Sequence, residues 1–133
     1  MNQIPEAYRD LISDAVRAYA FLATTMEDGT PQVTPVWFNT DGEHILINSA
    51  KGRVKDINMR ARPEVALAIM DLADPYRYLQ LRGRVIEITE VGGREHIDAL
   101  SKKYTGRDKF LSGNRSQDDV RVIYKIYPDR VTL

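Results

Sequence analysis

Residues 43–58, EHILINSAKGRVKDIN, decide how the rest of the sequence is interpreted. The apolar run Glu43–Ile47 has the character of a short strand, and Gly52–Ala61 has the character of a helix that Pro63 prevents from continuing. The region is rich in positive charge. Against the carboxylate of Asp56 stand five basic residues, Lys51, Arg53, Lys55, Arg60 and Arg62.

The basic start of this helix indicates a binding site for an anion. The first N–H groups of a helix have no partner inside the helix, and the positive end of the helix dipole lies there. Two or three long basic side chains added to such a start form a cradle for a phosphate group. A solvated helix face is the alternative interpretation, because runs of charge usually have that role.

Length and composition restrict the function further. The chain has 133 residues, which predicts one domain, residues 1–133, with its own core but little volume for a closed ligand cavity. A large ligand is therefore expected at the surface or between two subunits. The 19 basic and 19 acidic residues cancel, so nucleic acid is not an expected partner.

Two absences in the sequence point to the compartment. There is no cysteine, which excludes disulfides, thiolate nucleophiles and zinc–thiolate sites. The N-terminus does not resemble a signal peptide, and no apolar run approaches membrane-spanning length. These features predict a cytoplasmic protein without a membrane partner.

The remaining pattern predicts a mainly β fold. Asp28-Gly29 and Asp41-Gly42 are typical of tight hairpin turns, because glycine accepts the positive φ that such turns need, and they are expected to join three strands into a meander. The expected strands cover residues 20–26, 32–39, 43–48, 64–71, 76–89, 120–127 and 130–133. The expected helices cover residues 5–18, 52–61 and 94–103, and residues 104–118 are expected to form a long exposed loop.

Single residues refine this prediction. Pro35 inside a strand indicates a sheet edge or a bulge, and Gly83 indicates a bulge or a close backbone contact. Six or seven short antiparallel strands with helices at their junctions predict a small barrel or rolled sheet. Such closure removes the exposed edges that a small β protein must otherwise protect.

Several segments, taken in order, resemble one family. They are ATT at 23–25, DGTPQ at 28–32, PVWF at 35–38, GRVKDIN at 52–58, RP at 62–63 and PYRYLQLRGRV at 75–85. The ordered set resembles the pyridoxamine 5′-phosphate oxidase-like split-barrel superfamily, and within it the small deazaflavin-dependent reductases. The resemblance is strong over residues 18–90, and the ending Val120–Val131 is also typical.

The resemblance implies a split β-barrel homodimer that binds FMN or the deazaflavin coenzyme F420 in a groove between subunits. It implies a phosphate-binding pair, Arg53 and Lys55, and a small hydroxyl residue, Ser49, that faces the same phosphate. Ile57 departs from the family, where arginine is common. The implied cofactor-binding residues, together with Lys51 of the basic cluster, are Pro35, Val36, Trp37, Ser49, Lys51, Arg53, Lys55, Asn58, Tyr76, Arg77 and Tyr78.

These residues have roles that differ by segment. The segment Pro35–Trp37 matches the strand that runs beside the cofactor ring, and Tyr76–Tyr78 matches a segment that reaches the site from the neighbouring subunit. Trp37 either lines the ring or fills the barrel core. Tyr76 and Tyr78 either contact a ligand or pack at a dimer interface.

Other polar residues carry no assigned chemistry. His44 and His96 lack a metal-ligand partner at useful spacing, so each is expected to be a surface or internally hydrogen-bonded histidine. The pair Asp118-Asp119 is expected in a turn or at a strand start. Arg82 and Arg84 are expected either to pair with Glu87 or Glu90 or to meet an acidic cofactor tail. No metal site and no catalytic acid or base is assigned.

The prediction is an oxidoreductase that transfers a hydride between a flavin-type cofactor and a small organic acceptor, with F420 favoured over FMN. The alternative is a non-catalytic FMN- or F420-binding carrier of the same fold. A ligandless structural dimer is a third interpretation. A pyridoxamine-phosphate oxidase proper is less favoured, because the sequence shows no further C-terminal substrate-binding segment.

Overall fold

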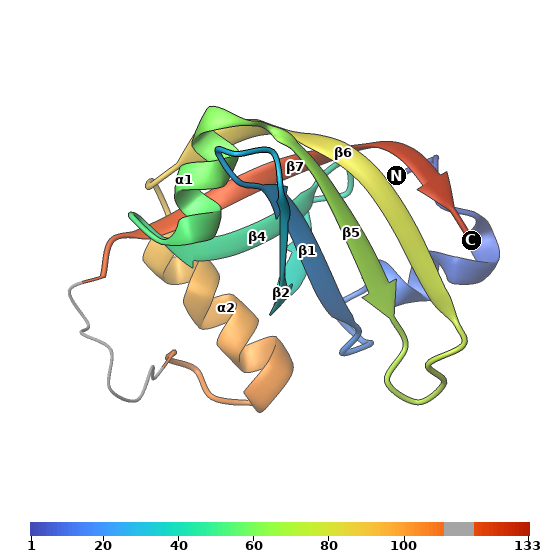
Figure 1. Ribbon diagram of the computed structural model, residues 1–133. Helices are drawn as coiled ribbons and strands as arrows, with labels where there is room; N and C mark the ends of the chain where they lie inside the picture. The colour runs from blue at the N-terminus through green and yellow to red at the C-terminus, as the bar shows by residue number, and fades with distance from the viewer. Residues whose placement is uncertain (111–118) are drawn as a thin grey trace.

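Alternation of apolar and polar side chains gives seven strands that pair into one antiparallel sheet (Figure 1). The computed structural model describes residues 1–110 and 119–133. The order across the sheet is β2-β1-β5-β6-β7-β4-β3. The strands are β1 (Tyr19–Thr25), β2 (Pro31–Val36), β3 (Phe38–Thr40), β4 (Ile45–Ala50), β5 (Glu64–Met70), β6 (Tyr78–Thr89) and β7 (Arg121–Thr132).

The sheet curls strongly and encloses the hydrophobic core on its concave side (Figure 1). Buried core side chains come from strands along the whole sheet and include Leu22, Phe38, Ile47, Leu67, Leu81 and Tyr124. In β6, buried side chains such as Leu79 alternate with exposed ones such as Gln80, as predicted. This curled antiparallel sheet is a split β-barrel, which confirms the predicted fold class.

Three helical segments cover the open parts of the barrel. They are the 3₁₀-helix η1 (Glu6–Ile12), α1 (Val54–Ala61) and α2 (Gly93–Thr105). Helix α1 lies over one end of the curl, and α2 packs against β4 and β7 (Figure 1). The Tyr124 hydroxyl, from inside the barrel, donates a hydrogen bond to Asp56 of α1. None of the described helices is both long and apolar enough to span a membrane.

The two predicted hairpins are confirmed, but the predicted meander is wrong. β1 pairs with β2 and β3 pairs with β4, and both Gly29 and Gly42 have positive φ. The predicted strand 32–39, however, is two strands separated by Trp37, which lie at opposite edges of the sheet. Because the sheet curls, the chain leaves one edge at Val36 and joins the other edge at Phe38. We call residues 36–38 the β2–β3 crossover.

The ends of several elements also differ from the prediction. The helix expected over residues 5–18 is only the 3₁₀-helix η1, because the chain becomes extended at Ser13, whose hydroxyl bonds the Asp10 carbonyl. Strand β6 begins at Tyr78 rather than residue 76. Helix α2 extends to Thr105, and residues 111–118 of the expected loop lie outside the described residues.

The turn expected at Pro128 is absent, since β7 continues to Thr132. Pro128 stands opposite Gly83, where the register between β6 and β7 shifts. A Cβ atom on Gly83 would lie 2.2 Å from the Tyr127 carbonyl oxygen, so this position requires glycine. The bulge accommodates a proline that has no N–H to donate to the ladder, which confirms the role predicted for Gly83.

Arginine pairing on the sheet surface differs from the expectation as well. Arg84 pairs with Asp129 at 3.2 Å rather than with Glu87 or Glu90. Glu87 pairs with Lys125, and Glu90 pairs with Lys51. Strand β7 supplies the partners of Arg84 and Glu87, and these cannot be recognised without knowing the strand order.

Candidate functional site

A cleft of about 430 Å³ opens between α2, the start of α1 and the β2–β3 crossover. It is the place where the structure gathers the largest group of predicted site residues. The lining residues are Tyr19, Pro35, Val36, Trp37, Asn48, Arg53, Lys55, Ile97, Leu100 and Phe110. One part of this lining is aromatic and aliphatic, and another part is cationic.

Stacked aromatic rings build the apolar wall. The Trp37 ring stacks on Tyr104 with centroids 5.3 Å apart, and Tyr104 stacks in turn on Tyr19 at 5.6 Å. Phe110 meets Trp37 edge-on at 5.9 Å. The Tyr104 hydroxyl donates to the Ala18 carbonyl at 2.6 Å, and burial raises the pKa of Tyr104, so the ring is fixed and neutral. Trp37 therefore both lines the cleft and packs against α2.

The cationic part of the cleft comes from the start of α1. Arg53 is the N-cap residue of α1, and Lys55 lies in its first turn. The helix start is held by Asp56, whose carboxylate accepts the Gly52 N–H at 2.9 Å. Burial by itself would raise the pKa of Asp56, but hydrogen bonds from Gly52, Tyr124 and Arg60 outweigh it and hold this pKa below its ordinary value. Asp56 therefore stays ionised and fixes the backbone that carries both cations.

Beneath the cleft lies a buried polar group centred on His96. The His96 ring nitrogens lie 3.1 Å from the Asn48 side-chain nitrogen and 2.8 Å from the Asn39 side-chain oxygen. Asn48 also accepts a hydrogen bond from Arg121 at 2.9 Å. Burial, and secondarily the charge of Arg121, lowers the pKa of His96 to about 4. His96 is thus a neutral, internally hydrogen-bonded histidine, which confirms the sequence expectation.

Five of the eleven predicted cofactor-binding residues line this cleft, namely Pro35, Val36, Trp37, Arg53 and Lys55. Two segments that are separate in the sequence, the crossover and the start of α1, therefore meet at one cavity. The other six residues lie elsewhere and are described next.

Three of these six lie near the basic stretch but outside the cleft lining. Ser49 is buried in β4 and directly follows the cleft residue Asn48. Because successive side chains of a strand point to opposite faces, Ser49 points to the face opposite that of Asn48. Lys51 is exposed and pairs with Glu90 at 3.3 Å. Asn58 is buried and donates to the Thr24 hydroxyl at 3.0 Å, which ties α1 to β1.

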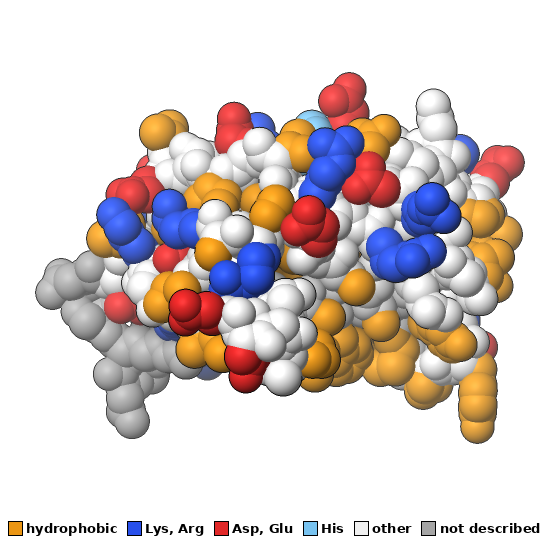
Figure 2. All heavy atoms as spheres, turned by 45° about the horizontal axis from the view of Figure 1, so that its top comes forward, with side chains coloured by type: hydrophobic (Ala, Val, Ile, Leu, Met, Phe, Trp, Pro, Cys, Tyr) orange, Lys and Arg blue, Asp and Glu red, His pale blue; other side chains and the backbone are white. Residues whose placement is uncertain are grey.

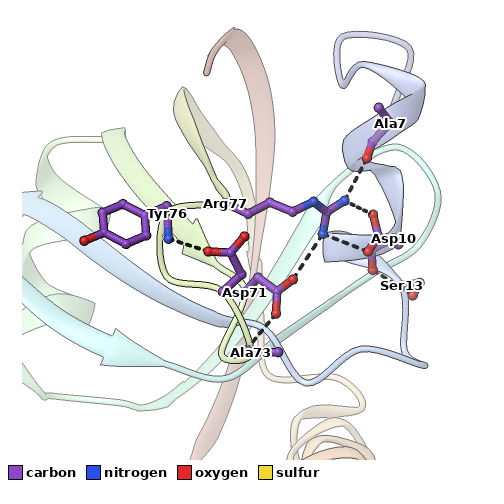
Figure 3. A network of polar contacts seen from close by, with 8 residues as sticks. Ala7, Asp10, Ser13, Asp71, Ala73, Tyr76 and Arg77 are labelled. Atoms are coloured by element: carbon purple, nitrogen blue, oxygen red, sulfur yellow. Dashed lines mark hydrogen bonds and ion pairs between the residues drawn. The ribbon is translucent and has the colours of Figure 1, made fainter.

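The remaining three, Tyr76, Arg77 and Tyr78, lie in and after the β5–β6 turn. Figure 3 shows the Arg77 guanidinium reaching away from Tyr76 towards η1, where it bonds Asp10 and the Ala7 carbonyl. Arg77 also pairs with Asp71 at 3.3 Å. We call Arg77 with these three partners the Arg77 clasp. Tyr76 is 93% exposed, and none of the three residues lines the cleft.

The sequence prediction missed five of the residues that line the cleft, which are Tyr19, Asn48, Ile97, Leu100 and Phe110. Ile97 and Leu100 are three apart on α2 and carry the ordinary signal of a buried helix face. Asn48 has a weak signal, because it is a polar residue at the end of an apolar strand.

Charges of both signs are mixed on the face that carries α1. Figure 2 shows Lys and Arg side chains interspersed with Asp and Glu across this face, while hydrophobic side chains gather along its lower margin. Among residues 1–110 and 119–133, no group of three potential metal ligands occurs. The local arrangement in the cleft, rather than overall charge, distinguishes the site.

The curled sheet and a cleft with a cationic end define the class of split-barrel proteins. The sequence matches the pyridoxamine 5′-phosphate oxidase family over residues 4–133. The chain therefore belongs to this family, as the ordered motifs predicted. No curated protein matches the sequence significantly.

Solved structures agree with this assignment. A protein named F420 reductase is 34% identical, with a TM-score of 0.83, and the match covers 97% of this chain and 98% of that protein. General Stress Protein 26 from Bacillus anthracis is 17% identical with a TM-score of 0.68, covering 95% and 89% of the two chains. HupZ from Group A Streptococcus is 21% identical with a TM-score of 0.64, covering 96% and 91%. The last two show the shared fold only.

Proposed function

We propose that this protein is an oxidoreductase that uses a flavin-type cofactor, with F420 favoured over FMN, to transfer a hydride to a small organic acceptor. One observation carries the proposal, which is that Arg53 and Lys55 share a single cleft with the β2–β3 crossover. The preference for F420 rests on the similarity to the F420 reductase.

The cleft fits a cofactor that has an anionic tail and a flat apolar ring. A phosphate suits the cationic end, because arginine offers a planar fork of donors and lysine offers a compact charge. Apolar side chains such as Trp37, Leu100 and Phe110 suit the ring. Strand β2 pairs only with β1 among the described strands, so its other edge offers backbone groups to ring heteroatoms.

When bound, the flavin or deazaflavin ring supplies the hydride chemistry. The chain orients the ligand through Arg53 and Lys55 and excludes water with the apolar wall. Among the described residues that line the cleft, Tyr19 is the one neutral side chain that carries an exchangeable O–H proton, and none of them is a carboxylate or a histidine. Proton delivery is therefore assigned to solvent or to Tyr19.

We also propose that the protein acts in the cytoplasm as a homodimer. The outer face of the sheet carries exposed large apolar residues, among them Val33, which is 65% exposed, and Tyr78, which is 40% exposed. Covering these residues with a second copy would remove apolar surface from water. Sedimentation of the purified protein tests this, and a monomer at micromolar concentration would remove the dimer from the proposal.

Spectral titration with FMN and with F420 tests the cofactor assignment. We expect F420 to bind with a Kd in the low micromolar range, roughly −8 kcal/mol, and more tightly than FMN. Failure of both cofactors to bind below about 100 μM would remove the enzyme proposal.

The non-catalytic carrier is the second candidate, and it is favoured by the fact that no described residue of the cleft lining is a carboxylate or a histidine. Turnover of the reduced cofactor with a panel of quinones, biliverdin and nitroaromatic compounds separates the two functions. Binding without turnover on any of these acceptors would favour the carrier.

A further inference from the structure

A continuous series of polar contacts joins the β2–β3 crossover to the cationic end of the cleft. It begins at Asn39, next to the crossover in β3, and passes through His96 of α2 to Asn48 of β4. It continues through Arg121 of β7 to Asp119 and ends at Arg53. We call these six residues the cleft network.

Hydrogen-bond chemistry fixes the direction of each contact around His96. The Asn48 side-chain nitrogen can only donate, and it donates to the Gly93 carbonyl at 2.9 Å and to Nδ1 of His96 at 3.1 Å. Nδ1 is therefore the acceptor, and the proton of the neutral ring is on Nε2, which donates to Asn39 at 2.8 Å. Reversing the amide of Asn48 would break its contact with Arg121, so one arrangement is selected.

At the other end of the cleft network, the carboxylate of Asp119 lies beside Arg53, the arginine that we propose binds the ligand. Arg121 is 6% exposed, and its Nε donates to Asn48 at 2.9 Å. Its guanidinium also lies 3.8 Å from the Asp119 carboxylate, whose same oxygen lies 3.6 Å from the Arg53 guanidinium. Asp119 is therefore the carboxylate that Arg121 and Arg53 share, with one ion pair to each.

We propose that His96 is a positioning residue that holds Arg53 in place for anion binding through Asn48, Arg121 and Asp119. The inference rests on the proposed function in taking Arg53 as a ligand for an anion. His96 is not among the described residues that line the cleft. Its effect is preorganisation, because a side chain already held in its binding position loses less conformational freedom when the ligand arrives.

The test measures binding of inorganic phosphate by protein-observed NMR titration. His96→Leu removes both hydrogen bonds while keeping an apolar side chain of similar size, and we expect phosphate affinity to fall about fivefold to tenfold. His96→Gln keeps one donor and one acceptor, and we expect affinity within about twofold of the wild type. Ser101→Ala is the matched control, because Ser101 is a buried polar residue of α2 that bonds Thr105 and Lys109 instead of the network.

A double-mutant cycle separates positioning from general damage to the fold. In the Arg53→Ala background, His96→Leu is expected to change phosphate affinity by less than about twofold, because its effect acts through Arg53. An equal loss in both backgrounds would overturn the proposal. If His96→Leu does not fold, Asn39→Ala replaces it, because this variant removes only the acceptor of the Nε2 proton at a half-buried site.

The outcomes distinguish this inference from the proposed function. Wild-type protein that binds neither phosphate nor either cofactor would overturn both. Wild-type protein that binds F420 or FMN but not phosphate would overturn the positioning role alone. Wild-type protein that binds phosphate, with His96→Leu and Asn39→Ala binding equally well, would overturn the positioning role alone. In the wild type, ¹⁵N chemical shifts that place the His96 proton on Nδ1 would also contradict it.

Discussion

Two arginines, one at the start of α1 and one in the β5–β6 turn, show how differently one residue type is used in this fold. Arg77 follows the far end of β5 and is held within the Arg77 clasp (Figure 3). Arg53 is the N-cap residue of α1, lines the cleft, and lies 3.6 Å from Asp119. Both arginines belong to segments that the family resemblance assigned to cofactor binding.

The difference lies in how each guanidinium is engaged. Arg77 meets two carboxylates and a carbonyl, and its hydrogen bond to Asp10 holds the pKa of that carboxyl below its ordinary value. Arg53 also has a carboxylate partner, Asp119, but in addition it lines the cleft. Within one chain, Arg77 joins η1 to the β5–β6 turn, whereas Arg53 faces a cavity. Contact geometry, more than residue type, distinguishes an arginine that joins two parts of the fold from one that lines a cleft.

The largest expected effect tests whether Arg53 and Lys55 bind the cofactor. Replacing both Arg53 and Lys55 by alanine should cost about 3 kcal/mol or more of cofactor affinity, because hydrogen bonds to charged groups contribute about 1.5–3 kcal/mol each. Spectral titration measures the change, which corresponds to at least about a hundredfold increase in Kd. Unchanged affinity in a folded double variant would reject the cationic cradle.

The second effect is a pH dependence that comes from His96. Its pKa in the folded protein, about 4, is below the ordinary value of 6.5, so the unfolded chain takes up the proton first as the pH falls. The free energy of unfolding should therefore decrease between pH 6.5 and pH 4, by roughly 3 kcal/mol in all, since each pKa unit corresponds to about 1.4 kcal/mol. Urea denaturation across this range measures it.

The matched variant for this pH series is His96→Gln, which has no titrating ring. It should lose less stability over the same range than the wild type does. A wild-type curve that is flat between pH 6.5 and pH 4 would show that His96 titrates normally. It would also show that the buried environment described for His96 is wrong.

The third effect tests the Arg77 clasp. Arg77→Met removes the bonds to Asp10, Asp71 and Ala7, and should lower Tm by roughly 3–6 °C, a modest loss because the site is partly exposed to water. Cofactor affinity should not change if the clasp is purely structural. A large increase in Kd would instead show that Arg77 reaches a ligand from a neighbouring subunit, as the family resemblance implied.

The smallest effect comes from an ion pair at the surface. Lys102 and Asp108 lie 2.9 Å apart, but both side chains are largely exposed. Lys102→Ala should change Tm by less than about 1 °C, because exposed pairs contribute little to stability. Differential scanning calorimetry alongside Arg77→Met provides the comparison, and equal shifts in the two variants would contradict it.

Local patterns predicted much of the fold. The Asp-Gly pairs located both hairpins, and Pro35 indicated the edge position of its strand. The break at Trp37 could not be predicted, because the residues around it keep a strand-like pattern while the chain passes between two sheet edges. Pro128 was interpreted as a turn because the partner that accommodates it, Gly83, is far away in the sequence.

The parts of the candidate site that come from continuous sequence motifs could be predicted. Arg53, Lys55 and the crossover line one cleft, and that this cleft holds a cofactor stays a prediction. The contributions of α2 and of Asn48 depend on tertiary packing, which a single sequence does not encode as a motif. His96 illustrates the limit, because the absence of metal-ligand spacing predicted an unreactive residue but not its position between two amides.

The β2–β3 crossover has a consequence for how the cavity can vary. Hairpins pin the register of β1 with β2 and of β3 with β4 independently, and Trp37 lies between the two pairs. A residue inserted beside Trp37 would lengthen one wall of the cavity while both ladders kept their partners. The size of the cavity and the pairing of the strands are therefore set by different parts of the chain. The cavity can change in size between related sequences while the strand pairing stays the same.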